Sequence, residues 1–364
     1  MDDDLGLAVR RKHAGLALFG QIWPGGAGVP FDDGVLLVDR TGRVAGLGPA
    51  ERVEVPAGFD RLGGPSHWVG PGVVDAHVHL AFGAPDEEFG GGLVGVRDLG
   101  APLDRALEWR TGPGAGAPYV AVAGPLLTAP GGYPANGWGA GGFAAFLASP
   151  ADAVAAVRRL AAAGVEVIKL ALEPAGRQPV PALDVATAAV RTAHEAGLPA
   201  VAHALTAPMV ERALAAGVDE LVHTPVEPLP PELVDRLAAA SVAVVSTLET
   251  LSSDGAPGPM HNARLLVAAD VRVIYGTDLG NAGTSAGVDP RELRRLAAAG
   301  LGPVGALVAA TEGAAAAAGM AGPTGRLAVG ERAAVVVLAG DPLADPERWR
   351  HPVAVVAGEL VVAA

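Results

Sequence analysis

Between residues 70 and 321 the chain alternates short apolar runs with helix-forming segments, and this alternation constrains its fold more than any other feature. Such a pattern predicts parallel strands joined by helical crossovers. The number of runs is the number that closes a (β/α)8 barrel. We expect the strands at residues 73–79, 93–98, 119–123, 165–170, 200–203, 220–223, 242–247 and 272–277.

Residues at the expected helix ends support this division. Ser149 can cap a helix that begins at Pro150, and Gly164 can end it. The alanine run 314–318 predicts a further helix. The same signals of capping, first turn and termination recur later in the chain, at Asp289, Pro290, Glu292 and Gly300.

The two flanks of this region have the pattern of β-structure. Thr41-Gly42 separates two alternating runs and predicts a β-hairpin, and strand-like runs return after Gly325. We expect residues 1–69 and 325–364 to form one discontinuous β-module, with a barrel of residues 70–324 inserted into it.

Composition limits the classes of function. The 364 residues carry a formal charge of −13, which opposes binding to nucleic acid. No apolar run approaches the roughly 20 residues of a membrane span. The acidic start and the absence of cysteine favour a cytoplasmic protein. We expect a soluble protein whose partner is a small molecule, with no nucleic acid and no membrane.

Histidines stand at several predicted strand ends. His77 and His79 point to the same side of one strand, although alone they are as well explained as ordinary polar residues. His203 and His223 end the fifth and sixth strands, and Asp278 follows the eighth. The carboxyl ends of barrel strands converge, so these side chains are expected to share one metal site.

Lys169 is one of only two lysines and lies in the apolar run "VEVIKL". Burial of a charged ammonium is costly, so a neutral or modified lysine is favoured there, and an ion pair with a buried carboxylate is the alternative. The remaining histidines are expected to be structural: His13, His67, His194, His261 and His351.

The loop 124–143 is rich in glycine and contains Tyr133, Trp138 and Phe143. Tyr133 and Trp138 are candidates for substrate binding. The alternative is a rigid connector whose aromatic side chains pack on the barrel rim. Residues 247–262 are a weaker candidate for a substrate loop.

Motifs along nearly the whole chain resemble the amidohydrolase superfamily, in its imidazolonepropionase-like and prolidase-like branch. They are "GVVDAHVHL", "GVRDLG", "VEVIKLAL", "AVAHAL", "ELVHTP", "VIYGTDLG" and "TGRLAVGERAAVVVLAGDPL". The resemblance implies a TIM-like metallohydrolase barrel inserted into a small β-sandwich, and it makes a homo-oligomer plausible.

The same resemblance implies a binuclear site with two divalent ions, for which we expect zinc. His77, His79 and Asp278 would bind the more buried ion, and His203 and His223 the second. Lys169, carboxylated by CO2, would bridge the two ions. This modification accounts for a lysine in an apolar strand, because arginine could not replace it.

The implied activity is hydrolysis of an amide-type bond in a peptide, an N-acyl amino acid or a cyclic amide. A hydroxide that bridges the metals would attack the carbonyl, with Asp278 as general acid and base. A mononuclear imidazolonepropionase-like cyclic amidase or deaminase is one alternative, and Lys169 argues against it. A non-catalytic barrel that acts as a binding or scaffold protein is the other.

Overall fold

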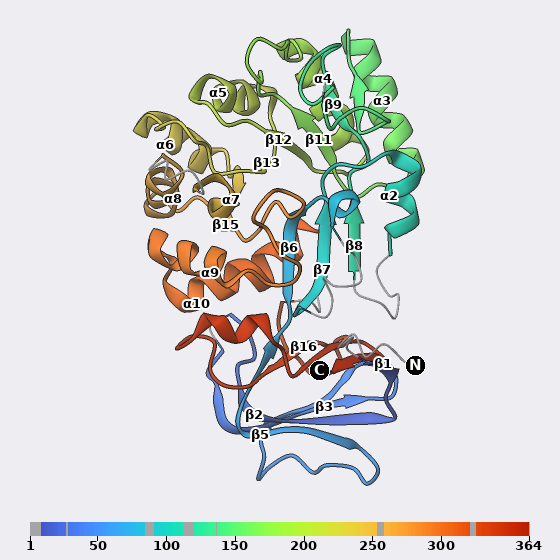
Figure 1. The fold of residues 1–364 in the computed structure, drawn as a ribbon, viewed down its shortest axis with the longest axis vertical. Coiled ribbons are helices and arrows are strands. Elements are labelled where there is room, and N and C mark those ends of the chain that lie inside the picture. The colour runs from blue at the N-terminus through green and yellow to red at the C-terminus, as the bar shows by residue number, and fades with distance from the viewer. Residues whose placement is uncertain are drawn as a thin grey trace.

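The computed structural model describes residues 9–26, 28–83, 91–111, 119–135, 137–252, 258–320 and 325–363. Figure 1 shows an antiparallel-rich sheet at one end of the molecule and parallel strands with their helices above it. The first and last described strands, Val9–Lys12 and Leu360–Ala363, pair with each other in the first sheet. The residues of the candidate site all belong to the second region.

The eight-stranded sheet combines strands from both ends of the sequence, in the order β1-β18-β17-β16-β5-β2-β3-β4. The predicted hairpin is confirmed in β3 and β4, and Gly42 has the positive φ of 75° that its turn requires. The strands are β1 (Val9–Lys12), β2 (Gly15–Ile22), β3 (Phe31–Asp39), β4 (Val44–Pro49), β5 (Asp60–Pro71), β16 (Ala334–Leu338), β17 (Ala354–Ala357) and β18 (Leu360–Ala363).

The parallel strands form two sheets, with the orders β6-β7-β8 and β10-β9-β11-β12-β13-β14-β15. All eight predicted strands are present among them. Their bounds are β6 (Val73–Val78), β7 (Leu93–Asp98), β8 (Tyr119–Val122), β9 (Leu126–Thr128), β10 (Ala144–Phe146), β11 (Ile168–Ala171), β12 (Ala200–His203), β13 (Glu220–Leu221), β14 (Ala243–Val245) and β15 (Val273–Ile274).

Backbone hydrogen bonds join the two parallel sheets at both sides. On one side, the Glu166 amide donates to the Val122 carbonyl at 3.0 Å. On the other, the Asp278 amide donates to the His77 carbonyl at 2.9 Å, and the His79 amide donates to the Leu279 carbonyl at 2.8 Å. The segment after β15 therefore runs directly beside the end of β6.

Several predicted strands extend beyond the observed ladders. β13, β14 and β15 are shorter than expected, although backbone bonds between neighbouring segments continue past them, as from the Ser246 amide to the Ile274 carbonyl at 2.8 Å. The Thr277 amide instead donates to the Asp75 carboxylate at 3.1 Å. The prediction that 124–143 is entirely loop was wrong. β9 lies within it and pairs in parallel with β11, and its three residues, two leucines and a threonine, are buried.

The predicted helix-end signals around α3 are confirmed. The Ser149 side chain accepts a hydrogen bond from the Asp152 amide, and Gly164 ends the helix with a φ of 91°. The described helices are α2 (Leu103–Trp109), α3 (Pro150–Ala163), α4 (Leu183–Glu195), α5 (Ala207–Ala216), α6 (Pro231–Ala239), α7 (Leu248–Ser252), α8 (Gly258–Ala268), α9 (Pro290–Leu296), α10 (Gly302–Val308) and α11 (Ala314–Ala317).

Glu292 in α9 has a different role from the one its position predicts. Asp289 caps α9 as expected, but the buried Glu292 carboxylate accepts from the amides of Leu248 and Glu249 at 3.0 and 2.6 Å. It therefore stabilises the start of α7, the helix that follows β14. Burial raises the pKa of Glu292 to about 7.

The helical stretch Pro290–Ala317 is long and apolar enough, by length and composition alone, to cross a membrane. Gly300, with a φ of 120°, interrupts it between α9 and α10. The stretch also packs against the strands, since the Tyr275 amide donates to the Ala309 carbonyl and the Tyr275 hydroxyl accepts from the Asp289 amide. These contacts are those of a core helix.

Arg97 in β7 connects elements of both parallel sheets. Its buried guanidinium forms an ion pair with Glu220 of β13 and donates to the carbonyls of Ala76 at 2.8 Å and Ala317 at 2.9 Å. A buried charge pair of this kind depends on both members, because either charge alone would lack compensation.

We expect Arg97→Met to lower the free energy of unfolding by about 3–5 kcal/mol, because it leaves the Glu220 carboxylate buried without a cation. Urea denaturation followed by circular dichroism measures this change. Arg105→Met is the matched control, since the Arg105–Glu108 pair is exposed and such pairs contribute about 0–1 kcal/mol. Equal losses in the two variants would contradict the structural role of Arg97.

Candidate active site and metal-binding cluster

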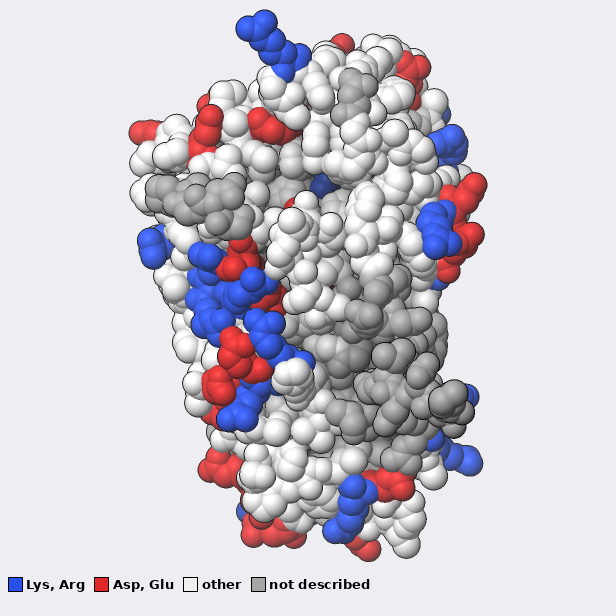
Figure 2. All heavy atoms as spheres, in the orientation of Figure 1, with Lys and Arg blue, Asp and Glu red and all other residues white. Residues whose placement is uncertain are grey.

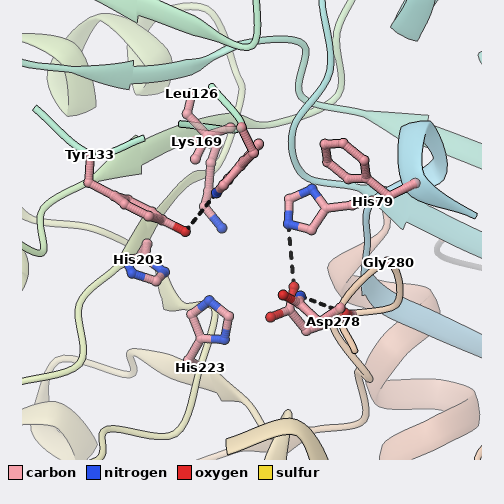
Figure 3. Close-up of a pocket in the computed structure, with 11 residues that line it drawn as sticks. His79, Leu126, Tyr133, Lys169, His203, His223, Asp278 and Gly280 are labelled. Carbon is pink, nitrogen blue, oxygen red and sulfur yellow. Dashed lines mark hydrogen bonds and ion pairs between the residues drawn. The ribbon is translucent and has the colours of Figure 1, made fainter. Parts of the chain in front are cut away.

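The carboxyl ends of the parallel strands bring the predicted site residues to one cavity of about 200 Å³. Figure 3 shows His203 and His223 on one side of Lys169, with His79 and Asp278 on the other. His77 lies fully buried beneath them. The residues that line the cavity are His79, Phe82, Leu126, Tyr133, Trp138, Lys169, His203, His223, Asp278, Gly280 and Asn281.

His77, His79 and Asp278 form a group that could hold a metal ion. The Nε2 atoms of both histidines lie 3.3 Å from Oδ1 of Asp278. All three side chains are buried. Two nitrogens and one oxygen at this separation are suitable ligands for zinc or a similar divalent ion.

The hydrogen-bond partner of the Nδ1 atom of His77 fixes the tautomer of this ring. Nδ1 of His77 lies 2.8 Å from the Val222 carbonyl, which can only accept, so Nδ1 carries the proton. Burial lowers the pKa of His77 well below its usual range, and the second nitrogen, Nε2, is then an unprotonated acceptor. Among the described residues, neither this Nε2 nor Oδ1 of Asp278 has a hydrogen-bond donor.

Two buried acceptors that face one another require a cation between them, because both present lone pairs. The group therefore fits a metal ion by its chemistry as well as by its spacing.

His203 and His223 form the other side of the cluster. Their ring centroids are 4.7 Å apart, and the His223 ring is also 4.7 Å from that of His77. Nδ1 of His223 is 3.0 Å from the Thr247 hydroxyl. Burial lowers the pKa of His223 to about 3 and that of His203 well below its usual range, so both rings are neutral.

Lys169 is almost completely buried, at 1% exposure, and its amine reaches the same cavity (Figure 3). Burial is the main cause that lowers its pKa to about 7. A large share of the amine is then neutral at physiological pH and can act as a nucleophile. The ion-pair alternative for Lys169 has no support among the described contacts, which include no salt bridge from this side chain.

Two residues of this region have backbone angles that non-glycine residues rarely adopt. Asp278 has a φ of 57° and Thr247 a φ of 43°. The second is the more unusual, because threonine is β-branched. The Thr247 amide donates to the Gly276 carbonyl at 3.0 Å, which holds its hydroxyl toward His223. Strain of this kind is typical of functional sites.

Aromatic side chains form one wall of the cavity. Tyr133 stacks on His203 with centroids 4.9 Å apart, and its hydroxyl accepts from Trp138 Nε1 at 3.2 Å. Phe143 lies behind this wall and stacks on Phe82 at 5.4 Å. The rings of this segment pack against one another, as expected for a rigid connector on the rim of the strands. Tyr133 and Trp138 also line the cavity.

Four cavity residues were not predicted from the sequence: Phe82, Leu126, Gly280 and Asn281. Phe82 lies three residues after His79, and Asn281 lies three residues after Asp278. Their nearness in the sequence to a candidate ligand could have identified them as cavity residues. The histidines expected to be structural do not line the cavity. His13, for example, contacts the Gly358 carbonyl, and His194 contacts Asp219.

Known proteins resemble this chain in sequence and in structure. An uncharacterized protein of Mycobacterium tuberculosis is 31% identical over 219 residues, and this chain spans about half (54%) of that relative's length. A candidate prolidase from Bifidobacterium longum is 27% identical, with a TM-score of 0.81 over 96% of this chain and 95% of the other. An Xaa-Pro dipeptidase with methionine in its active site is 19% identical, with a TM-score of 0.83 over 96% and 100%.

The family is established by a longer match. Residues 68–360, which include every candidate ligand, match the model of the Amidohydrolase family. This family is generally metal-dependent, in agreement with the group formed by His77, His79 and Asp278. The chain belongs to the amidohydrolase family.

Proposed function

We propose that this chain is a hydrolytic enzyme that acts on C–N bonds and cleaves an amide-type bond of a small molecule, such as a peptide, an N-acyl amino acid or a cyclic amide. The observation that carries the proposal is the pair of buried acceptors, Nε2 of His77 and Oδ1 of Asp278, which face each other without a donor. The names of the two similar structures, a candidate prolidase and an Xaa-Pro dipeptidase, also refer to amide hydrolysis.

The proposed ligands divide into two groups. His77, His79 and Asp278 hold one divalent ion, and His203 and His223 hold the second. Zinc is the ion we expect, because the ligands are nitrogen and oxygen. A bound divalent ion lowers the pKa of a water ligand toward about 7 and polarises a carbonyl oxygen.

Lys169 completes the proposed ligand set as a carboxylated side chain. Its neutral amine attacks the carbon of CO2 and loses one proton, which gives a carbamate anion with two oxygen ligands. The support for this step is the position of Lys169 in the cavity between the two groups of histidines (Figure 3) and its lowered pKa.

Asp278 is the proposed general acid and base. It accepts a proton from the attacking water as the oxygen bonds to the substrate carbonyl carbon. It then transfers this proton to the leaving nitrogen as the C–N bond breaks. In its ionised form the Asp278 carboxylate can accept this proton. Tyr133 and Trp138 are the proposed substrate contacts.

We propose that the two parallel sheets close into one (β/α)8 barrel. The hydrogen bonds at both of their sides support this closure. So does a separate apolar cluster of five buried side chains from neighbouring strands: Leu99, Ala123, Val167, Val201 and Val222. We also propose the division into a module of residues 1–69 and 325–364 and a barrel of residues 70–324, and the strand order, which places β1 to β5 and β16 to β18 in one sheet, supports it.

The first prediction concerns metal content. Enzyme purified without chelators is expected to contain two divalent ions per chain by elemental analysis, and removal of the metal should abolish amide hydrolysis until zinc is added back. Asp278→Asn should lower kcat by about 10²-fold or more, because a general acid–base group is lost. Asp235→Asn, on an exposed face of α6, is the control. One ion per chain would favour the mononuclear alternative.

The second prediction tests whether Lys169 acts through its carboxylated form or through its positive charge. Lys169→Arg keeps a cation but cannot form the carbamate, so we expect loss of the second ion and of activity. Native mass spectrometry should detect added CO2 on Lys169 in the wild type alone. Lys12→Arg is a matched control, because Lys12 is the other lysine and pairs with Glu359 at the surface. An active, two-metal Lys169→Arg enzyme would exclude the modification.

The third prediction concerns the orientation of His223. Thr247→Val preserves the β-branched shape but removes the hydroxyl that His223 Nδ1 contacts, and Thr247→Ser preserves the hydroxyl. We expect the valine variant to bind the second ion about 10–100-fold more weakly, as for other losses of an outer hydrogen bond to a ligand. Competition with a chelator measures this affinity. Thr192→Val, at a buried threonine of α4, should leave it unchanged.

A further inference from the structure

We infer that the site takes uncharged amide-type substrates that carry an aromatic or alkyl group, and disfavours substrates with a free carboxylate. This inference rests on the proposed function and narrows it. Small primary or secondary amides and cyclic amides fit this description, whereas free dipeptides and N-acyl amino acids do not. The argument comes from the part of the cavity that the proposed ligands leave for the substrate.

That part of the cavity is mostly apolar. Without the proposed ligands, the lining consists of Phe82, Leu126, Tyr133, Trp138, Gly280 and Asn281. Its polar side chains, Tyr133, Trp138 and Asn281, each have a partner within the protein. Trp138 Nε1 donates to the Tyr133 hydroxyl, and the Asn281 side-chain amide donates to the Asp278 carbonyl at 2.9 Å. The remaining surface of this space is apolar and suits an aromatic or alkyl group.

Arginine and lysine side chains, which pair with carboxylates, are almost absent from the described lining of the cavity. Among the described residues, Lys169 is the one lysine or arginine in its lining, and the proposed function uses it as a metal ligand. The segments outside the described residues contain no lysine or arginine in their sequence, so they add no cation at the rim. The segment 84–90, which follows the short 3-10 helix η1 (Leu80–Phe82), contains Asp86, Glu87 and Glu88.

The arginines of α9 lie in a different groove and are already paired. Arg291 contacts Asp289 at 2.7 Å, and Arg295 contacts Glu249 at 2.5 Å. That groove shares no lining residue with the candidate site. Figure 2 shows the basic side chains gathered on this flank, while the described surface around the central hollow is largely uncharged.

A substrate carboxylate in this part of the cavity would lie among apolar side chains, outside the group of proposed metal ligands. Removal of the carboxylate from water would cost free energy that no arginine or further lysine in the described lining offsets. A neutral carboxamide of the same shape avoids this desolvation of a charge. Discrimination between the two should appear in kcat/KM, which measures differential binding of the transition state.

The test uses matched pairs of substrates with the metal-reconstituted wild-type enzyme. Each pair is a free acid and its primary amide, taken from N-acetyl amino acids, dipeptides and carboxylated cyclic amides. We expect kcat/KM to be at least about tenfold higher for the amide member of each pair that is cleaved. A preference for the free acids would overturn this inference and leave the proposed function intact. Cleavage of no member would contradict the proposed function itself.

A charge-introducing variant tests the same inference from the protein side. Phe82 lines the cavity and is 47% exposed, so Phe82→Arg places a cation at its rim. We expect the acid-to-amide ratio of kcat/KM to rise by about tenfold or more. Asn281→Lys is a second variant with the same expected direction. Phe146→Arg is the control, because Phe146 is 53% exposed and outside the cavity. An unchanged ratio in both cavity variants would contradict the inference.

Discussion

The contact between the Asp278 carboxylate and the imidazoles of His77 and His79 is the interaction on which the site depends. It exists because the segment after β15 bonds to the end of β6, with the Asp278 amide on the His77 carbonyl. The same seam is held by Asp75, whose carboxylate accepts from the Thr277 hydroxyl at 2.6 Å. The hydrogen bonds that join the first and last parallel strands also hold together the group that could bind a metal ion. The fold and the candidate site therefore depend on the same bonds.

Burial gives the cluster its chemical character, and partners outside the cluster give it orientation. Desolvation keeps the imidazoles of His77, His203 and His223 neutral and the Lys169 amine partly neutral, which is the state that ligands and nucleophiles require. The Val222 carbonyl and the Thr247 hydroxyl each contact the Nδ1 atom of a histidine and leave Nε2 free. Arg97 and Glu220 compensate each other nearby, so their charges add little to the field at the site.

The candidate ligands could be predicted from sequence because each stands at or near the end of an apolar strand, and parallel strands place such ends together. Lys169 was conspicuous because it interrupts an apolar run in a chain with two lysines. Thr247 and Asn281 could not be predicted in this way, since their roles depend on left-handed backbone at Thr247 and Asp278. Glu292 lies in the first turn of α9 as expected, but the contact of its carboxylate with a helix distant in sequence could not be predicted. Local patterns identify strand ends, but not contacts between loops.

The eight-stranded sheet affects how the chain can fold during synthesis. β5 pairs with β16, and β1 pairs with β18. Each of these two N-terminal strands therefore lacks its C-terminal partner until that partner has left the ribosome. In that interval their edges and apolar faces are exposed, and an unpaired edge can accept a strand from another molecule. The parallel strands and their helices are synthesised in between and can associate first. The interval before the sheet is completed is therefore the period in which a nascent chain is most prone to aggregation.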